Sequence, residues 1–583
     1  MSFEQAALLT LLAGMLVLFA IERFRIEVVA IAGLLAGYAL GLYPREAIFS
    51  GFASPVTITV VEILVIVQVL ARTRLVGTFA DRLIAAEPRS FTTIAVLGGA
   101  TAFISVFMNN IGAYALALPA ALRLGTLPAT SRRQLLMPIS FSALLGGLVS
   151  LIGTPANLLI SQALAKETGQ GFHFFDFAYV GLPVAAAGVL LLAVLLPRLF
   201  PPDAEGSDDP AGEAPPRRFI VERMVPPGSP LVGLALSALS SAFDIEAHSI
   251  LRSGRFVFGA REKIAIDAND ILVAEAADST FIELAASGAL APEPTATPAA
   301  APSARSEAVV MPESTLVGSR IRSLEVFQSR GVAITGLSTR SSRIEGRFAD
   351  LRLSIGDILQ LEGPRRAIAD ALEECECLPL AAQDSRPARH RSFLPVGLFV
   401  AGILVSAFGL APPDISFAGV LLAMALLNLI QLRQALSEID WPIVIMLAAM
   451  LPLGAAVATT GTAEMLASSL GAWVPVERAA AGVALILFLG VAITPFVNNA
   501  TVAIMLTPVA FELAAKAGHT PQAYLIAVAL GASLDFLTPF GHHNNTLTMS
   551  IGPYRFTDFI RAGLPLTLVS YGLGLALICL VWL

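Results

Sequence analysis

Two segments of this chain, FMNNIGAYALALP at 107–119 and FVNNATVAIMLTP at 496–508, share a phenylalanine, two adjacent asparagines and a closing proline in one register. Each is followed further along by a Thr-Pro step inside an apolar run, in SLIGTPANLLIS at 150–161 and DFLTPFGHHNNTL at 535–547. Because two unusual elements recur in the same order, the pattern predicts that the chain contains an internal repeat.

The composition indicates a membrane protein. Of the 583 residues 56% are hydrophobic and 14% are charged, which is more apolar surface than a soluble domain of this size buries. Runs that approach the roughly 20 apolar residues needed to cross a bilayer recur along the chain. They lie at 6–21, 28–42, 56–70, 180–196, 393–410, 417–430, 442–457 and 562–583. The first run lacks a basic n-region and a cleavage site, so we expect it to be retained as a span.

A polar stretch interrupts the apolar pattern after position 200. It contains two Pro/Ala-rich segments, at 201–216 and 291–304, that have too few apolar side chains to fold. The pieces between them open alike, with GSPLVGLALSAL at 228–239 and ESTLVGSRIRSLEV at 313–326. We therefore predict two duplicated α+β modules, at 218–287 and 307–382, with linkers at 201–217, 288–306 and 383–392.

Arginines predict the orientation of the chain in the membrane. The positive-inside rule makes alternate loops cytoplasmic, through Arg23, Arg25, Arg72, Arg74, Arg82 and Arg89, and places the N-terminus outside. The apolar run at 91–122 is too long for one ordinary span and has arginines on both sides, Arg89 before it and Arg123, Arg132 and Arg133 after it. We predict a re-entrant hairpin that enters from the cytosol, with Asn109 and Asn110 at its tip.

The count of crossings then determines the rest of the topology. The run at 135–163 crosses outward and 180–196 returns, so the polar insert is cytosolic. The second half begins inside, its hairpin at 480–513 enters from outside, and the C-terminus is external. The predicted fold is an all-α polytopic membrane protein of two inverted repeats, 1–200 and 393–583, each with five spans and one re-entrant hairpin, with the α+β modules inserted between them.

Polar residues gather where the helices are expected to break. Non-helical backbone at membrane depth is tolerated where it is buried in protein or lines a wet cavity. Free carbonyls and side-chain oxygens there suit Na⁺, and amides at half-helix N-termini suit an anion. The residues concerned are Asn109 and Asn110, Thr154 and Pro155, Asn498 and Asn499, and Thr538 and Pro539. A single motif of this kind is better explained by interhelical hydrogen bonds or a proline kink, but four in symmetric positions favour a binding site.

The segments around these breaks contain no lysine or arginine. Amides, hydroxyls and a co-bound cation must therefore hold any bound anion, which predicts cation coupling. Asp535 is the one carboxylate that adjoins the breaks, and it is either a coupling group or a cap of the broken helix. His542 and His543 are either proton carriers or structural hydrogen-bonding groups.

At these residues the chain resembles the divalent anion:sodium symporter family, in particular bacterial permeases with TrkA C-terminal-like (RCK-C) modules between their membrane halves. The resemblance covers essentially the whole chain, and it rests on FMNNIGAYALALP, LIGTPANLLIS, VNNATVAIMLTP and DFLTPFGHHNNTLTMSIGPYRFTDF. It implies a homodimer in the bacterial inner membrane, in which a transport domain slides like an elevator against a scaffold. It also implies that the RCK-C-like modules bind a small regulatory ligand.

The resemblance implies two Na⁺ sites with a shared site for a small divalent anion between them. The binding residues implied for the first half are Asn109, Asn110, Gly153, Thr154, Pro155 and Asn157, and those for the second half are Asn498, Asn499, Thr501, Thr538, Pro539 and Asn545. The Na⁺ ligands are expected among Asn109, Asn110, Gly153, Asn498, Asn499 and Thr501.

The tips of the two hairpins depart from the family's pattern. Its dicarboxylate carriers have Ser-Asn-Thr at both tips, whereas this chain has Asn-Asn-Ile and Asn-Asn-Ala-Thr, and His543 stands where glutamine is expected. The hydroxyls that contact carboxylates are partly missing, which places sulfate or another oxyanion slightly ahead of a dicarboxylate.

Other function classes fit the sequence less well. The sequence contains no TVGYG-like filter of the kind found in potassium channels, and two opposed hairpins favour alternating access over a ligand-gated pore. An enzyme would need a partnered nucleophile, base or metal site, and the Cys-Glu-Cys sequence at 375–377 is too incomplete to specify one. Neither module has a Gly-rich nucleotide fingerprint, and we expect no cofactor and no nucleic-acid partner. Coupling to protons instead of Na⁺ stays open.

Overall fold

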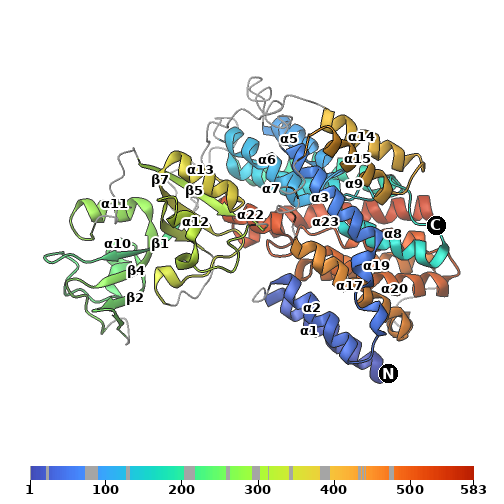
Figure 1. The fold of residues 1–583 in the computed structure, drawn as a ribbon, viewed down its shortest axis with the longest axis horizontal. Helices are drawn as coiled ribbons and strands as arrows, with labels where there is room; N and C mark the ends of the chain where they lie inside the picture. The colour runs from blue at the N-terminus through green and yellow to red at the C-terminus, as the bar shows by residue number, and fades with distance from the viewer. Residues whose placement is uncertain are drawn as a thin grey trace. The chain divides into compact units, whose positions relative to one another are not determined.

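A computed structural model provides the fold (Figure 1). It describes residues 2–21, 25–71, 90–125, 131–201, 217–257, 263–291, 303–312, 314–339, 346–380, 394–430, 435, 439, 441–471 and 478–583. Two compact units make up the chain, a helical unit of Met1–Ser207 with Ser385–Leu583 and a mixed unit of Asp208–Asp384. Arg23, Arg72, Arg74, Arg82, Arg89 and most of the predicted linkers lie outside the described residues.

The apolar runs of the first half form helices. They are α1 (Phe3–Ile21), α2 (Ile26–Ala39), α3 (Pro55–Ala71), α5 (Ser90–Ser105), α6 (Asn110–Leu124), α7 (Arg132–Gly147), α8 (Pro155–Thr168) and α9 (Ala178–Leu199), with short 3₁₀ turns η1 (Arg45–Ala47) and η2 (Ser50–Ala53) before α3. A capping box begins α7, since the side chains of Ser131 and Gln134 each accept a hydrogen bond from the other's backbone N–H. The predicted run at 135–163 is therefore two helices separated by a break.

The second half is helical as well. It contains α14 (Leu394–Ala407), α15 (Pro413–Leu426), α17 (Trp441–Thr459), α18 (Thr462–Gly471), α19 (Ala479–Ile493), η6 (Thr494–Phe496), α20 (Asn499–Ala517), α21 (Gln522–Gly531), α22 (His543–Ile551) and α23 (Phe556–Trp582). A 65° bend separates α17 from α18, where Gly461 adopts a positive φ of 70°.

Several of these helices can cross a membrane by length and composition. Among the described residues four qualify alone: Ala178–Leu199, Ala479–Phe496, Asn499–Ala517 and Phe556–Trp582. The bent pair α17 and α18 provides a fifth if it is one span. The remaining apolar helices are shorter, so the structure supports a multi-pass membrane protein and leaves the number of spans as a prediction.

The mixed unit is built on one eight-stranded sheet. Its strands are β1 (Arg218–Met224), β2 (Glu246–Arg252), β3 (Arg255–Phe256), β4 (Ile271–Ala277), β5 (Ser303–Val310), β6 (Ala333–Ser338), β7 (Ile358–Pro364) and β8 (Cys377–Pro379), and its helices are α10 (Ala238–Phe243), α11 (Asp278–Ala286), η4 (Ile321–Ser323), α12 (Glu325–Gln328), η5 (Phe348–Asp350) and α13 (Arg365–Glu374). The strand order is β3-β2-β4-β1-β6-β7-β5-β8. The expected modules thus share a sheet through β1 and β6, and β5 begins inside the range expected to be a linker.

Matched hydrogen bonds support the predicted duplication of this unit. Ser229 Oγ donates to the Ala289 carbonyl and Ser314 Oγ to the Cys375 carbonyl, and each serine also accepts the N–H two residues later. Likewise, Asp270 accepts the N–H of the residue three before it, and so does Asp357. The two modules of the mixed unit therefore contain the same local hydrogen bonds.

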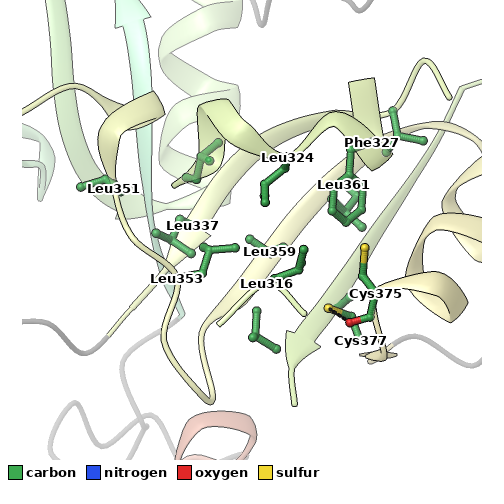
Figure 2. Close-up of a cluster of buried hydrophobic side chains, with 14 of the residues drawn as sticks. Leu316, Leu324, Phe327, Leu337, Leu351, Leu353, Leu359, Leu361, Cys375 and Cys377 are labelled. Carbon is green, nitrogen blue, oxygen red and sulfur yellow. Dashed lines mark hydrogen bonds between the residues drawn. The ribbon is translucent and has the colours of Figure 1, made fainter. Parts of the chain in front are cut away.

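Cys375 and Cys377 belong to the apolar core of the second module (Figure 2), where they lie with leucines such as Leu316 and Leu359. Burial raises the pKa of the Cys375 thiol to about 11 and that of Cys377 to about 12, so both are protonated at neutral pH. In the described part of the chain no three metal-ligating side chains gather. The structure therefore explains this pair as packing.

The duplicated aspartates differ in one partner. Arg252 donates to both carboxylate oxygens of Asp270, at 2.9 and 2.8 Å. In the second module the matching place after β6 holds Thr339, whose hydroxyl is a weaker, neutral partner for Asp357. Burial raises the pKa of Asp357 to about 7, against the opposing effect of the Ser354 amide and the Thr339 hydroxyl.

We predict that Asp357 makes the stability of the mixed unit depend on pH. In the folded state Asp357 keeps its proton to about pH 7, while in the unfolded state it loses the proton near 3.8, so the contribution of Asp357 to stability is greatest below that lower value. It falls as the pH rises to about 7 and is level above. Asp357→Asn should remove this decline and stabilise the unit at pH 8 by on the order of a few kcal/mol.

Hydrogen exchange of β5 and β7 in the detergent-solubilised chain, corrected for intrinsic exchange rates, measures this effect. Asp270→Asn is the matched control, and it should destabilise the unit at neutral and higher pH because it removes the anionic partner of Arg252. An unchanged pH profile in Asp357→Asn would contradict the prediction.

Candidate functional site

Asparagine caps begin one helix of each half. The side-chain oxygen of Asn109 accepts the Gly112 N–H at 2.8 Å at the start of α6, and that of Asn498 accepts the Thr501 N–H at 2.9 Å at the start of α20. Each cap satisfies an amide that would otherwise lack a partner. Since a carbonyl oxygen has two lone pairs, the capping bond leaves each side chain able to bind a cation as well.

A second break lies between α7 and α8 in the first half, and between α21 and α22 in the second. Thr154 caps α8 by accepting the Ala156 N–H at 3.1 Å, with Pro155 as the first helical residue. His542 caps α22 by accepting the Asn544 N–H on Nδ1 at 3.2 Å. Because this nitrogen acts as an acceptor, protonating it would break the cap, which favours the structural role for His542 over proton transfer.

One asparagine in each half stabilises the loop before its helix. The amide nitrogen of Asn157 donates to the carbonyls of Ser150 at 2.8 Å and Gly147 at 3.3 Å, seven and ten residues earlier. That of Asn545 donates to the carbonyls of Thr538 at 3.1 Å and Asp535 at 2.8 Å, again seven and ten residues earlier. We call this arrangement the asparagine staple.

Hydroxyls connect each staple loop to the asparagine cap of the same half. Ser150 Oγ donates to the carbonyl of Val106, and Thr538 Oγ1 donates at 3.2 Å to that of Pro495, three residues before each capping asparagine. The residues just before Val106 and Pro495 are Ser105 and Thr494, and their hydroxyls donate to the helix that precedes the staple loop. Their acceptors are the Ala143 carbonyl at 2.7 Å and the Gly531 carbonyl at 3.1 Å.

The last helix of each half packs closely against the start of its staple loop. A Cβ on Gly181 of α9 would lie 2.2 Å from the Leu148 carbonyl oxygen, and one on Gly563 of α23 would lie 2.0 Å from the Phe536 oxygen. Only glycine allows these backbones to approach so closely. The repeat predicted from the sequence is thus supported by matching bonds and contacts.

These bonds correct the pairing of the two Thr-Pro steps. The sequence pattern matched Thr154 with Thr538, but Thr154 caps its helix as His542 does, and Thr538 bonds as Ser150 does. Pro539 lies in the loop four residues before α22, so it does not begin a helix as Pro155 does. Of the two alternatives for Asp535, the helix cap is excluded, because neither of its carboxylate oxygens accepts a hydrogen bond within the described residues.

The two halves meet at these breaks. The amide nitrogen of Asn544 donates at 3.0 Å to the Asn110 carbonyl, and Ser140 Oγ donates at 2.7 Å to the side-chain oxygen of Asn545. Conversely, α8 of the first half packs against α20 and α21 of the second. A single site built from both halves is therefore possible in this arrangement.

Several buried oxygens at the breaks accept no hydrogen bond from the described part of the protein. They are Asn157 Oδ1, Asn499 Oδ1, Thr501 Oγ1, Asn544 Oδ1 and both carboxylate oxygens of Asp535. Amide and carboxylate oxygens are acceptors only, and no lysine or arginine occurs in 90–122, 134–165, 479–515 or 517–554. Oxygen ligands without nearby donors suit a hard monovalent cation such as Na⁺.

The predicted site residues divide into two groups. Asn157, Asn499 and Thr501 are buried and present free oxygens, whereas every side-chain polar atom of Asn545 is bonded within the protein. The sequence prediction missed Asn544 and the hydroxyls of Ser105, Ser140, Ser150 and Thr494. A signal for two of them was available, because a hydroxyl residue precedes both capping asparagines by four positions.

The remaining predicted residues line the same breaks. The side-chain oxygen of Asn110 accepts Ser105 Oγ at 3.0 Å. A Cβ on Gly153 would lie 2.5 Å from the Gly147 carbonyl oxygen, so the end of this loop packs closely against its start. The carbonyl of Pro539 accepts Thr546 Oγ1 at 2.8 Å, which gives Pro539 a role in holding α22.

Comparison with known proteins identifies a transporter. A family model described as citrate transporter (CitMHS) matches residues 16–531 and 480–583. An uncharacterized transporter of Synechocystis is 29% identical over 576 residues, 95% of this chain and 93% of that protein, and one of Escherichia coli is 26% identical over 608 residues, 98% of each. Sodium/sulfate cotransporter 1 of Chlamydomonas reinhardtii is 27% identical over 280 residues, 44% of this chain and 30% of that protein.

We predict that the asparagine staple is required for stability. Asn545→Asp keeps the oxygen that accepts from Ser140 but loses both donors to the loop carbonyls. The variant should lose at least about 1–3 kcal/mol of stability, because these carbonyls are left unpaired and a carboxylate is buried beside them, seen as a lower melting temperature in detergent. Asn428→Asp, at an exposed position, is the control. Equal melting temperatures for both variants would show that the staple contributes nothing.

Proposed function

Because this chain belongs to the citrate transporter (CitMHS) family, we propose that it is a secondary active transporter that couples Na⁺ to the movement of a small divalent anion. It is a membrane transporter and not an enzyme. The observation that carries the proposal is the set of buried acceptor oxygens at two matched helix breaks, in segments that contain no lysine or arginine.

Na⁺ is the coupling ion that these oxygens fit best. Asn499 and Thr501 belong to α20, which packs against α8, the helix that carries Asn157, and all three present a buried oxygen without a hydrogen-bond partner in the described protein. Such neutral oxygens bind a cation without requiring a change of protonation. The name of the Chlamydomonas relative, sodium/sulfate cotransporter, supports the same ion.

The anion is proposed to bind between the breaks, held by half-helix N-termini and by the bound cations. The helices α6, α8, α20 and α22 all begin at these breaks, and each N-terminus carries partial positive charge. A co-bound Na⁺ offsets the cost of desolvating an anion where no fixed cation is available. Sulfate is the leading candidate because of that relative's name, and citrate and dicarboxylates are the alternatives.

An elevator movement of two inverted repeats in a homodimer is the proposed mechanism, and the mixed unit is the proposed cytosolic regulator, with two RCK-C-like modules. One contact supports the proposed orientation. Arg133, at the start of α7, donates at 2.8 Å to Asp558 at the start of α23, whose carboxylate also accepts the Arg555 N–H. These arginines therefore share one membrane side, as the positive-inside rule requires.

Uptake by proteoliposomes tests the proposed function. Labelled sulfate should accumulate under a Na⁺ gradient and not under a proton gradient alone, and unlabelled sulfate should compete better than thiosulfate, succinate or citrate. Accumulation driven only by protons would replace Na⁺ with H⁺ as the coupling ion. Downhill flux without accumulation would contradict ion coupling, as expected of a channel or an uncoupled carrier.

Removal of one free oxygen should weaken Na⁺ binding selectively. Asn499→Ala deletes an acceptor that has no partner in the described protein, so folding should tolerate it. The half-saturating Na⁺ concentration should rise roughly 5- to 100-fold, equivalent to about 1–3 kcal/mol. Ser416→Ala, a buried hydroxyl on α15, is the control and should leave it unchanged. A normal Na⁺ response in Asn499→Ala would remove this residue from the site.

The proposed topology predicts which sites an impermeant maleimide reaches. In a chain without its native cysteines, Ser287→Cys at the exposed end of α11 should react only after the cells are permeabilised. Leu583→Cys, at the proposed external C-terminus, should react in intact cells. Labelling of Ser287→Cys in intact cells would refute the inverted-repeat topology.

A further inference from the structure

Asp535 is a buried carboxylate that lies in the loop between α21 and α22. Its side chain is 0% exposed, and neither oxygen has a hydrogen-bond partner within the described residues. Only its backbone carbonyl is bonded, to the staple Asn545. An ionised carboxylate in this environment is costly unless a positive charge neutralises it.

Two other buried aspartates in the described part of the chain have such a charge. Asp558, 1% exposed, accepts from Arg133, and Asp270, also 1% exposed, accepts from Arg252. No lysine or arginine occurs within 517–554 to serve Asp535 in this way. The other titratable groups of this stretch nearest in sequence are His542, whose Nδ1 is already an acceptor in the helix cap, and His543. A bound cation can supply the neutralising charge, and a bound proton is the alternative that the test below distinguishes.

The carboxylate points into the break. A Cβ on Gly541 would lie 2.4 Å from both oxygens of Asp535, so the carboxylate rests against the residue that precedes the His542 cap. Because Gly541 has no side chain, the carboxylate can approach its backbone this closely. The carboxylate therefore lies at the start of α22, where the transport site is proposed.

The first half shows which atoms surround this position. Gly147 is the residue that the staple matches to Asp535, and a Cβ added there would lie 2.4 Å from Asn110 Oδ1 and 3.2 Å from the Gly153 carbonyl oxygen. Asn110 matches Asn499, whose own oxygen is free. Asp535 thus adds a carboxylate to a cluster of neutral oxygens that the first half contains without one.

We propose that Asp535 is an anionic ligand of a Na⁺ ion bound in the second half of the site, which makes the two cation sites unequal in charge. This rests on the proposed Na⁺ coupling and deepens it. The first site has only neutral ligands and gains one positive charge when it is loaded. The second site is negative when empty and neutral when loaded.

Na⁺ binding to the purified protein tests this directly. In Asp535→Asn, binding of radiolabelled Na⁺ without substrate should lose one ion per protomer. Sulfate uptake should show a Na⁺ Hill coefficient lower by about one, with half-saturation raised about tenfold or more. Charge moved per sulfate should also change by one elementary charge. Glu512→Gln on α20 removes a carboxylate away from the break and should change none of these.

A second variant keeps the charge and moves it. Gly541→Ala places a methyl group where the carboxylate lies, so it should raise the half-saturating Na⁺ concentration while the number of bound ions stays unchanged. If the parent protein shows no dependence on Na⁺, the proposed function fails. If the parent depends on Na⁺ and Asp535→Asn keeps its stoichiometry and half-saturation, this inference alone is overturned. Loss of pH dependence with normal Na⁺ binding would assign a proton to Asp535 and overturn it also.

Discussion

Each staple loop leaves carbonyls without helical partners, and in a membrane protein no water is at hand to satisfy most of them. Asn157 and Asn545 solve this in the same way, because each amide nitrogen has two hydrogens and reaches two carbonyls of the loop before it. These bonds hold the non-helical backbone of the break in one conformation. The helix N-termini and oxygen ligands around it are then held ready for an ion.

The two staple loops have the same frame and different chemistry. Hydroxyls from Ser150 and Thr538 connect both frames to their capping asparagines, so these positions are held by geometry. One difference between the halves changes the charge at the break, because Asp535 stands where the first half has Gly147. The two halves thus share the hydrogen bonds that shape the backbone and differ in charge at this position.

The sequence predicted the places where helices break, because an asparagine pair or a Thr-Pro step interrupts an apolar run visibly. It could not align the breaks correctly. Thr538 and Thr154 both precede a proline in the sequence, but the residue that caps a helix as Thr154 does is His542. The sequence did not predict the role of the Ser105 and Thr494 hydroxyls, because serine and threonine are common in membrane helices. Only the carbonyls they reach, on another helix, distinguish them. In the mixed unit, the strand β5 began in a segment whose proline content indicated a linker.

The proposed carrier site is formed by both breaks and must bind cation and anion together. Counterflow in proteoliposomes measures this, with unlabelled sulfate inside, a trace of labelled sulfate outside, and equal Na⁺ on both sides so that no gradient drives uptake. Labelled sulfate should accumulate transiently inside, and replacing Na⁺ with choline on both sides should abolish this overshoot. Equilibration of the label without an overshoot, or an overshoot that persists in choline, would contradict it.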